Sequence, residues 1–244
     1  MSTFTYLITG ASRSLGLGYT RALLAARPEA RVVAAARNPS SAPDLQALAK
    51  EDANKDRVYL LQLDVEDKEQ VAKAAKELEA SGFLQNGLDA LIHNAGVALN
   101  HQVKPSQLEP EHVLDNLNVN VFGVLNVNKA FLPLLGKGKG KQVFSLSSVC
   151  ASLEQWGNNV MTPAYSVSKA ALNMWMSKLA AELGPKGYTV IMFHPGYVQT
   201  DMNQSKGDIT TEEAADLAVK NVFLAAKPEL NGAFLRYSGE KMPW

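Results

Sequence analysis

The stretch TGASRSLGLG, from Thr9 to Gly18, joins a short apolar run to a segment with helical periodicity. A glycine-rich turn between a strand and a helix is the setting in which backbone amides bind a phosphate group. Gly10 permits the tight turn, and Gly16 lets the amides at the helix start approach a pyrophosphate. The stretch therefore predicts a dinucleotide site, although an ordinary strand-to-helix turn has the same local pattern.

Outward from this turn, the chain alternates between apolar runs and amphipathic segments. The runs expected to form strands are Phe4 to Thr9, Val32 to Ala36, Val58 to Leu63, Leu88 to His93, Val143 to Leu146, Thr189 to Phe193 and Ala233 to Tyr237. The segments expected to form helices are Leu15 to Arg27, Asp67 to Ser81, Glu111 to Leu135, Ala164 to Leu183 and Thr211 to Ala226, with a weaker pattern over Asp44 to Asn54. Such alternation predicts parallel strands joined by right-handed crossovers. We expect one α/β domain over residues 1–244, a doubly wound (Rossmann), mostly parallel, seven-stranded sheet with helices on both faces.

The composition is that of an ordinary globular protein, with 46% hydrophobic and 20% charged residues. Its 24 basic and 24 acidic residues cancel, which argues against a nucleic acid partner. We expect no membrane association, because no apolar stretch looks long enough to span a bilayer and MSTFTYLITGASR lacks the form of a signal peptide. The single cysteine, Cys150, is typical of a reducing compartment, so a cytoplasmic location is expected.

At its glycine-rich turn the sequence resembles the short-chain dehydrogenase/reductase family, whose opening motif is Thr-Gly-x-x-x-Gly-x-Gly. Ser14 stands where the middle glycine is usual, so that position has to tolerate a side chain close to the cofactor. We favour an added hydroxyl donor over weakened binding, because the other motif residues are present. The resemblance implies a cofactor-binding set at this turn: Thr9, Gly10, Ser12, Arg13, Ser14, Leu15 and Gly16.

The end of the second predicted strand bears on the choice of cofactor. Sites that prefer NAD usually place an acidic residue here for the ribose hydroxyls. In this chain the strand ends in Arg37, whose guanidinium suits a phosphate, and Arg13 can approach the same group from the other side. Two arginines without a carboxylate favour NADPH; the alternative is that Arg37 is a solvated residue at a strand end.

Further cofactor contacts follow from the resemblance at later strand ends. It assigns Asp64 to the adenine edge and Val65 to the adenine face. The element His93-Asn94-Ala95-Gly96 is similar to the family's Asn-Asn-Ala-Gly. Asn94 is therefore expected to brace the central strands, and Gly96 to let the backbone pass close to the cofactor, while His93 is expected to be structural.

The segment HPGYVQT after the sixth predicted strand resembles the family's Pro-Gly segment over the nicotinamide. The resemblance implies cofactor contacts for Pro195, Gly196, Val198 and Thr200, of which Val198 and Thr200 meet the carboxamide. His194 is expected to be packed rather than reactive.

Tyr165 and Lys169 lie four residues apart on a predicted helix, so both side chains project from one face. An ammonium next to a phenol favours the phenolate, which lowers the pKa of the tyrosine and eases donation of its proton. The apolar run Phe144 to Val149 ends in hydroxyls and places Ser148 at the carboxyl edge, where it bonds a substrate carbonyl oxygen that gains negative charge. Ser147 is the competing candidate, but adjacent strand residues point to opposite faces.

Asn120 completes the catalytic set that the resemblance implies. An asparagine inside a helix is costly unless its amide is used, and the spacing to Gly123 selects Asn120 over Asn118. The resemblance gives Asn120 the role of holding a water that links Lys169 to solvent.

The resemblance covers nearly the whole chain, and its motifs are similar to those of sniffer-type and C-factor-type carbonyl reductases. It implies NADPH-dependent reduction of a ketone or aldehyde to an alcohol, without a metal. Trp156 and Met161, inside an extended segment from Cys150 to Ala164, suggest an apolar or aromatic substrate. Two alternatives stay open: a catalytically silent dinucleotide-sensing protein, which the intact catalytic set disfavours, and an NAD-linked alcohol dehydrogenase, which Arg37 disfavours.

Self-association into a dimer or tetramer is a further expectation from the resemblance. Leu172, Trp175 and Leu179 offer an apolar helix face for it, but a buried core face explains these residues equally well.

Overall fold

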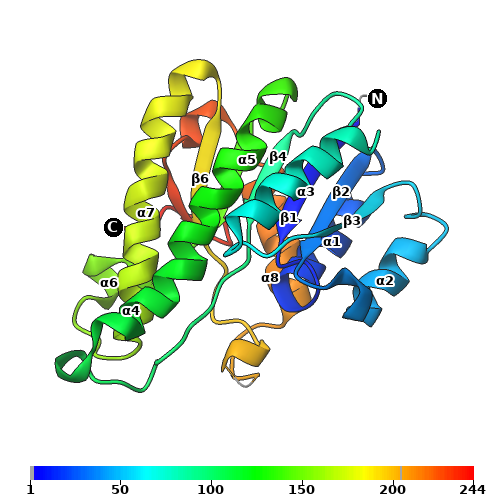
Figure 1. Ribbon diagram of the computed structural model, residues 1–244. Coiled ribbons are helices and arrows are strands. Elements are labelled where there is room, and N and C mark those ends of the chain that lie inside the picture. Colours follow the sequence, from blue (N-terminus) through cyan, green and yellow to red (C-terminus); the bar gives the residue numbers. More distant parts are fainter. Residues whose placement is uncertain (1–2, 204) are drawn as a thin grey trace.

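The structure, a computed structural model, describes residues 3–203 and 205–244. Its strands form one seven-stranded sheet in the order β3-β2-β1-β4-β5-β6-β7 (Figure 1). The strands are β1 (Phe4–Thr9), β2 (Ala30–Ala36), β3 (Val58–Gln62), β4 (Ala90–His93), β5 (Gln142–Leu146), β6 (Thr189–His194) and β7 (Phe234–Arg236). Every pair of neighbouring strands is parallel, so the sheet is entirely rather than mostly parallel. The strand order reverses between β1 and β4, which is where such sheets bind ligands.

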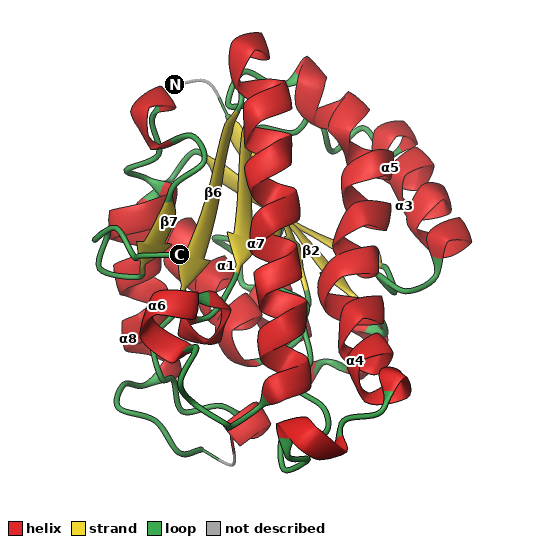
Figure 2. Ribbon diagram, turned by 90° about the vertical axis from the view of Figure 1, so that its left-hand side faces the viewer, coloured by secondary structure: helices red, strands yellow, loops and turns green. Residues whose placement is uncertain are grey.

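Helices cover both faces of this sheet. They are α1 (Ser14–Ala26), α2 (Pro43–Lys50), α3 (Lys68–Ala80), α4 (Pro110–Leu117), α5 (Val124–Lys137), α6 (Leu153–Trp156), α7 (Pro163–Leu183) and α8 (Thr211–Ala218), with π-helical turns η3 (Asn118–Gly123) and η7 (Val219–Phe223). Figure 2 shows the layers: α1 and α8 lie on one face of the sheet, and α3, α5 and α7 lie on the other. The predicted doubly wound architecture is confirmed.

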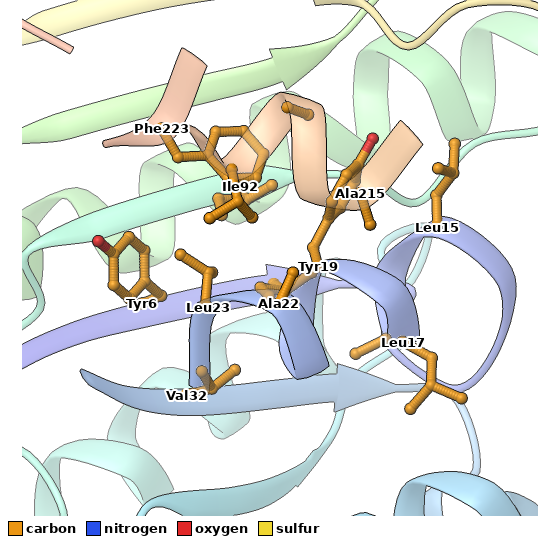
Figure 3. Close-up of a cluster of buried hydrophobic side chains, with 14 of the residues drawn as sticks. Tyr6, Leu15, Leu17, Tyr19, Ala22, Leu23, Val32, Ile92, Ala215 and Phe223 are labelled. Atoms are coloured by element: carbon orange, nitrogen blue, oxygen red, sulfur yellow. The ribbon is translucent and has the colours of Figure 1, made fainter. Parts of the chain in front are cut away.

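The strands point alternate side chains into the two helical layers. In β1, Tyr6 and Ile8 join a cluster with α1 and α8, whereas Leu7 joins the cluster with α3, α5 and α7. Figure 3 shows the first cluster, in which Tyr19 of α1 approaches Phe223 above the strands. Their ring centroids are 5.2 Å apart with planes at 76°, an edge-to-face contact. The two layers thus hold the strands whose carboxyl ends carry the predicted site residues.

The segment predicted as one helix over Glu111 to Leu135 is interrupted by η3. With this turn, α4 and α5 span Pro110–Lys137, which is long and apolar enough to cross a membrane by length and composition alone. That finding corrects the expectation that no stretch reaches such a length. Val127, Phe131 and Leu135 are fully buried against the sheet, so packing in the core explains the apolar composition of this helix.

Other differences from the predicted elements are local. α2 ends at Lys50 rather than Asn54, and the helix predicted to reach Ala226 passes into η7 after Ala218. The short helix α6 lies within the long segment between β5 and α7. It was not predicted, because four residues carry too little periodicity to detect.

The helix face suggested for self-association is occupied within the chain. Leu172 is buried, and Trp175 and Leu179 pack against the same interior cluster as α3 and α5. The core explanation for these residues therefore holds. On the outward side of α7, Val167 and Met174 are exposed, and assembly into a dimer or tetramer stays a prediction.

We predict that Phe223→Ala lowers the free energy of unfolding by about 3–5 kcal/mol, because a buried phenylalanine leaves a cavity when truncated. The substitution also removes the edge-to-face or tilted ring contacts that Phe223 makes with Tyr19, Phe144 and Phe193. Urea unfolding measures the change. Phe122→Ala, at a half-exposed position, is the matched control and should cost about 1 kcal/mol or less; equal losses would contradict this account of the core.

Candidate active site

The turn after β1 keeps the backbone of a glycine motif even where the residue is serine. Gly10 has a φ of +67° and Ser14 a φ of +47°, both in the left-handed region that glycine favours. Ser14 therefore adopts the conformation expected of the usual glycine, at a cost of about 1–2 kcal/mol. The departure from the family motif changes the side chain and leaves the path of the turn intact.

The ends of β1 and β4 are joined through two side chains. Asn94 Nδ2 donates to the backbone carbonyls of Thr9 and Gly10 at 2.9 and 3.1 Å. In return, the Thr9 hydroxyl accepts from the backbone N–H groups of Asn94 and Ala95, both at 3.1 Å. Asn94 thus braces the central strands as predicted, and it does so at the point where the strand order reverses.

Gly16 is required by packing within the protein itself. A Cβ atom at this position would lie 2.2 Å from the Gly10 carbonyl oxygen and 2.7 Å from Asn94 Nδ2. Nothing larger than glycine fits there. Glycine is therefore required at position 16 because α1 packs closely against the turn. This requirement holds whether or not a pyrophosphate binds there.

The start of α1 is suited to an anionic group. The N-cap residue, Arg13, has an extended backbone and makes no side-chain cap bond with the described residues, and the first turn contains no acidic residue. Uncapped amides at the positive end of a helix dipole favour a phosphate. Ser12 and Ser14 are half-buried beside these amides, whereas Leu15 points into the core and could meet a cofactor only through its backbone. The residues present thus fit a dinucleotide.

The two arginines expected at the cofactor phosphate have different surroundings. Arg37 is exposed directly after β2. Arg13 does not lie free beside it: its guanidinium is 2.9 Å from the Asp201 carboxylate, and the two side chains are 72% and 69% exposed. An ion pair so open to water contributes little, about 0–1 kcal/mol. Arg13 is paired with Asp201 in this structure, but it can exchange this carboxylate for a phosphate at low cost in free energy.

Asp64 and Val65 follow the end of β3, as predicted. The Asp64 carboxylate accepts from the backbone N–H of Glu66 at 3.1 Å and so closes its own turn. The Val65 carbonyl accepts from Asn126 Nδ2 at 3.0 Å, which ties the turn to α5. Contact of these residues with an adenine stays a prediction.

The segment after β6 turns back toward the core. Pro195 and Gly196 are half-buried, and the Val198 side chain belongs to the interior cluster with α1 and α8. Only the backbone of Val198 is therefore left for the expected contact with a carboxamide. Thr200 Oγ1 and its backbone N–H both lie within hydrogen-bond distance of Asn203 Oδ1, at 3.4 and 3.1 Å.

The structure brings Tyr165, Lys169 and Ser148 together beyond the carboxyl end of β5. Lys169 Nζ donates to the carbonyl of Leu146, the last residue of β5, at 2.7 Å. The same nitrogen lies 5.7 Å from the centre of the Tyr165 ring. The Ser148 hydroxyl lies close enough to the Tyr165 phenol to affect its pKa and accepts from the Cys150 N–H at 3.2 Å.

Burial dominates the protonation of this pair. It raises the pKa of the Tyr165 phenol above its usual value, with Cys150 acting in the same direction and the neighbouring Ser148 hydroxyl opposing both. It lowers the pKa of Lys169 to about 8. The net shift of the Tyr165 pKa is therefore upward, opposite to the lowering expected from the neighbouring Lys169. Lys169 Nζ is directed at Leu146, and removal from water outweighs its charge at this distance.

The two candidate serines have separate surroundings. Ser148 lies beside Tyr165, whereas the Ser147 hydroxyl donates to Asn173 Oδ1 at 2.6 Å in the interior. Adjacent residues thus point in opposite directions, as the alternation of a strand predicts. The structure therefore supports Ser148 over Ser147 as the serine at the site.

Asn120 is fully buried in η3, and π-helical turns of this kind often occur at functional sites. Its Oδ1 accepts from the Val97 N–H at 2.9 Å, and its Nδ2 donates to the Val97 carbonyl at 2.8 Å and to Ser168 Oγ at 2.9 Å. A Cβ atom at Gly96 would lie 3.0 Å from Asn120 Oδ1 and 3.5 Å from Lys169 Nζ, so the three residues meet. Both amide protons are used within the protein, so the predicted water would have to bond an oxygen of Asn120.

Two polar residues of this region escaped the sequence analysis. Ser168 accepts from Asn120 and donates to the Tyr165 carbonyl at 2.7 Å, linking η3 to α7. Asn116, one turn before Asn120, bonds the backbone of Leu99 through both amide atoms, at 3.0 and 3.2 Å. Asn116 could have been predicted from the sequence, because it lies four residues before Asn120 and this spacing puts both amides on one helix face.

Both histidines at strand ends are buried. Burial lowers the pKa of His93 to about 3 and that of His194 to about 4. His93 Nε2 lies 2.8 Å from Asn128 Nδ2 in the interior. A neutral, buried ring bonded to the protein agrees with the structural role expected for His93.

A parallel, doubly wound sheet with an anion-binding turn where its strand order reverses defines a dinucleotide-binding protein, and the Tyr165–Lys169 pair beside that turn points to an oxidoreductase. The chain belongs to the short-chain dehydrogenase family, whose model matches residues 5–211.

Individual relatives agree with this family. An uncharacterized oxidoreductase of Schizosaccharomyces pombe is 34% identical over 98% of this chain and 97% of its own. Among solved structures, the carbonyl reductase Sniffer of D. melanogaster superposes with a TM-score of 0.89 at 28% identity over the whole of both chains. The NADPH-bound carbonyl reductase from chicken fatty liver gives 0.88 at 27% identity, again with full coverage of both.

We predict that Gly10→Ala destabilises the protein more than Gly187→Ala, although both glycines have positive φ values. A Cβ at Gly10 would lie 3.0 Å from the Ala95 Cα, whereas nothing lies within 4 Å at Gly187. Strain alone should cost about 1–2 kcal/mol at either position, and the contact with the segment after β4 adds to it only at Gly10. Urea unfolding compares the two variants; equal losses would show that the turn is not packed against that segment.

Proposed function

We propose that the protein reduces a ketone or aldehyde to an alcohol with NADPH and that Tyr165 donates the proton. The observation that carries this proposal is the meeting of Tyr165, Lys169 and Ser148 beyond the end of β5, next to a turn suited to a dinucleotide. Bound reduced nicotinamide supplies the hydride for the carbonyl carbon. The protein positions the carbonyl and handles the proton.

Each residue has a distinct task in this proposal. The Ser148 hydroxyl donates to the carbonyl oxygen, a bond that strengthens as this oxygen gains negative charge. The Tyr165 hydroxyl then gives its proton to the same oxygen. Its raised pKa keeps it protonated at neutral pH. Lys169, charged below about pH 8, stabilises the phenolate that remains.

Three observations support NADPH over NADH. Arg37 stands exposed at the end of β2, where an acidic residue is typical of NAD sites. Arg13 is held only by an open ion pair. A carbonyl reductase of nearly the same fold was solved with NADPH bound.

The surroundings of the site support an apolar substrate. Leu153, Val160 and Met161 are exposed on the segment between Ser148 and α7. Trp156 lies half-buried in the same segment. Such side chains favour an aliphatic or aromatic carbonyl compound over a charged one.

Tyr165→Phe should lower the rate of carbonyl reduction by about 10²–10⁴-fold, because the ring remains but the proton is lost. The variant should still bind NADPH, since the turn after β1 is untouched. Reduction of a panel of aromatic ketones, followed by the loss of nicotinamide absorbance, measures the rate, and calorimetry measures binding. Tyr188→Phe, directly before β6 and beyond the end of α7, is the matched control and should keep full activity. Full activity in Tyr165→Phe would refute the proposed proton donor.

Arg37→Asp should weaken NADPH binding by about 10- to 100-fold, because a phosphate contact is replaced by repulsion. The dissociation constant for NADH should change much less, which a titration of nucleotide fluorescence can show. Arg21→Asp makes the same charge change on the exposed side of α1 and controls for net charge. Equal catalytic efficiency of the unmodified protein with NADH and NADPH would contradict the proposed preference.

A further inference from the structure

Ser147 and Asn173 form a buried polar pair directly behind the candidate active site. Ser147 Oγ donates to Asn173 Oδ1 at 2.6 Å, and the two residues are 2% and 3% exposed. We infer that this pair is a positioning device, which sets the place of α7 along the end of β5 and so aligns Tyr165 and Lys169 with Ser148. The inference rests on the proposed function and adds two residues that touch neither substrate nor cofactor.

The pair is one half of a two-point attachment between α7 and β5. Asn173 lies four residues after Lys169 and eight after Tyr165, so the three side chains follow one face of α7. Lys169 bonds the Leu146 carbonyl and Asn173 bonds the hydroxyl of the next residue, Ser147. Successive turns of α7 thus form hydrogen bonds with successive residues at the end of β5.

The strand side of this attachment is itself held firmly. The backbone N–H of Ser147 donates to the Phe193 carbonyl of β6 at 2.7 Å. The next residue is Ser148, whose hydroxyl lies beside Tyr165. A shift of α7 relative to Ser147 therefore changes the distance between Ser148 and Tyr165.

Packing alone does not account for the pair. Leu172 and Met176 surround Asn173 on α7 and are buried in an apolar cluster, where an amide and a hydroxyl cost free energy unless bonded. Asn173 Nδ2 has no hydrogen-bond partner among the described residues, so the bond from Ser147 to Oδ1 is the side-chain bond that this amide makes there. A hydrogen bond is directional, whereas apolar contacts let a helix slide by fractions of an ångström. Misplacement of about 1 Å can cost about 100-fold in rate.

Ser145 provides a matched control for the test. It lies in β5, two residues before Ser147, is fully buried, and its hydroxyl has no partner in the described part of the chain. Ser147→Ala and Ser145→Ala therefore each remove one buried hydroxyl near the end of β5, and only the first breaks a bond to α7.

The first measurement is turnover with NADPH and a ketone that the unmodified protein reduces. Ser147→Ala should lower kcat by about tenfold or more, with KM and the dissociation constant of NADPH changed less than about threefold, because binding groups stay in place. Ser147→Thr keeps the hydroxyl and should restore most of the rate. Ser145→Ala should match the unmodified protein. A kcat of Ser147→Ala within about twofold of that of Ser145→Ala would overturn the inference.

The second measurement needs no turnover. Burial lowers the pKa of Lys169 to about 8, and this titration can be followed by carbon NMR of labelled lysine in the full chain, assigned with Lys169→Met. In Ser147→Ala a displaced α7 should let water reach Lys169 and move its pKa toward the ordinary value of 10.5. Equal titration in the Ser147→Ala and Ser145→Ala proteins would count against the positioning role. Full activity of Tyr165→Phe would instead refute the proposed function, and the lysine titration would still decide the inference.

Discussion

The bonds from Asn94 to Thr9 and Gly10 are the contact on which the rest of this structure depends. They join β1 to β4, which are far apart in sequence and adjacent in the sheet, at the point where the strand order reverses. Gly16 closes onto Gly10 and Asn94, so the start of α1 is placed by the same contact. The uncapped amides of α1 and the candidate active site therefore share one point of attachment, and their separation is set there.

Buried polar side chains that bond to the backbone organise the catalytic half. Asn116 and Asn120 bond the backbone of Leu99 and Val97, while Lys169 bonds that of Leu146. Each such group would be costly in the interior if it lacked a partner. Paired with a backbone group, it places a helix against a strand end more specifically than apolar contact can. The carboxyl ends of β4 and β5 are in this way linked to the helices that carry the reactive groups.

The protonation of Tyr165 and Lys169 follows from the same burial. Removal from water raises the pKa of the phenol and lowers that of the ammonium, so both groups are pushed toward their neutral forms. A tyrosine that stays protonated and a lysine that titrates near pH 8 suit a proton donor that works at neutral pH. The spacing of the two residues along a helix predicts that they meet, but the direction of each shift depends on how deeply the fold buries them.

The amino-acid sequence alone predicts the order of strands and helices along the chain, the glycine-rich turn, and the pairing of Tyr165 with Lys169. All of these depend on periodicity or on residues a few positions apart, which a single chain displays directly. Four features could be seen only in the folded chain: Arg13 bonds Asp201, Val198 points into the core, Ser147 bonds Asn173, and the long helix passes through η3 at Asn120. Those features depend on partners distant in sequence and on the depth of burial, because a side chain's bonds and charge are set by what the folded chain brings against it.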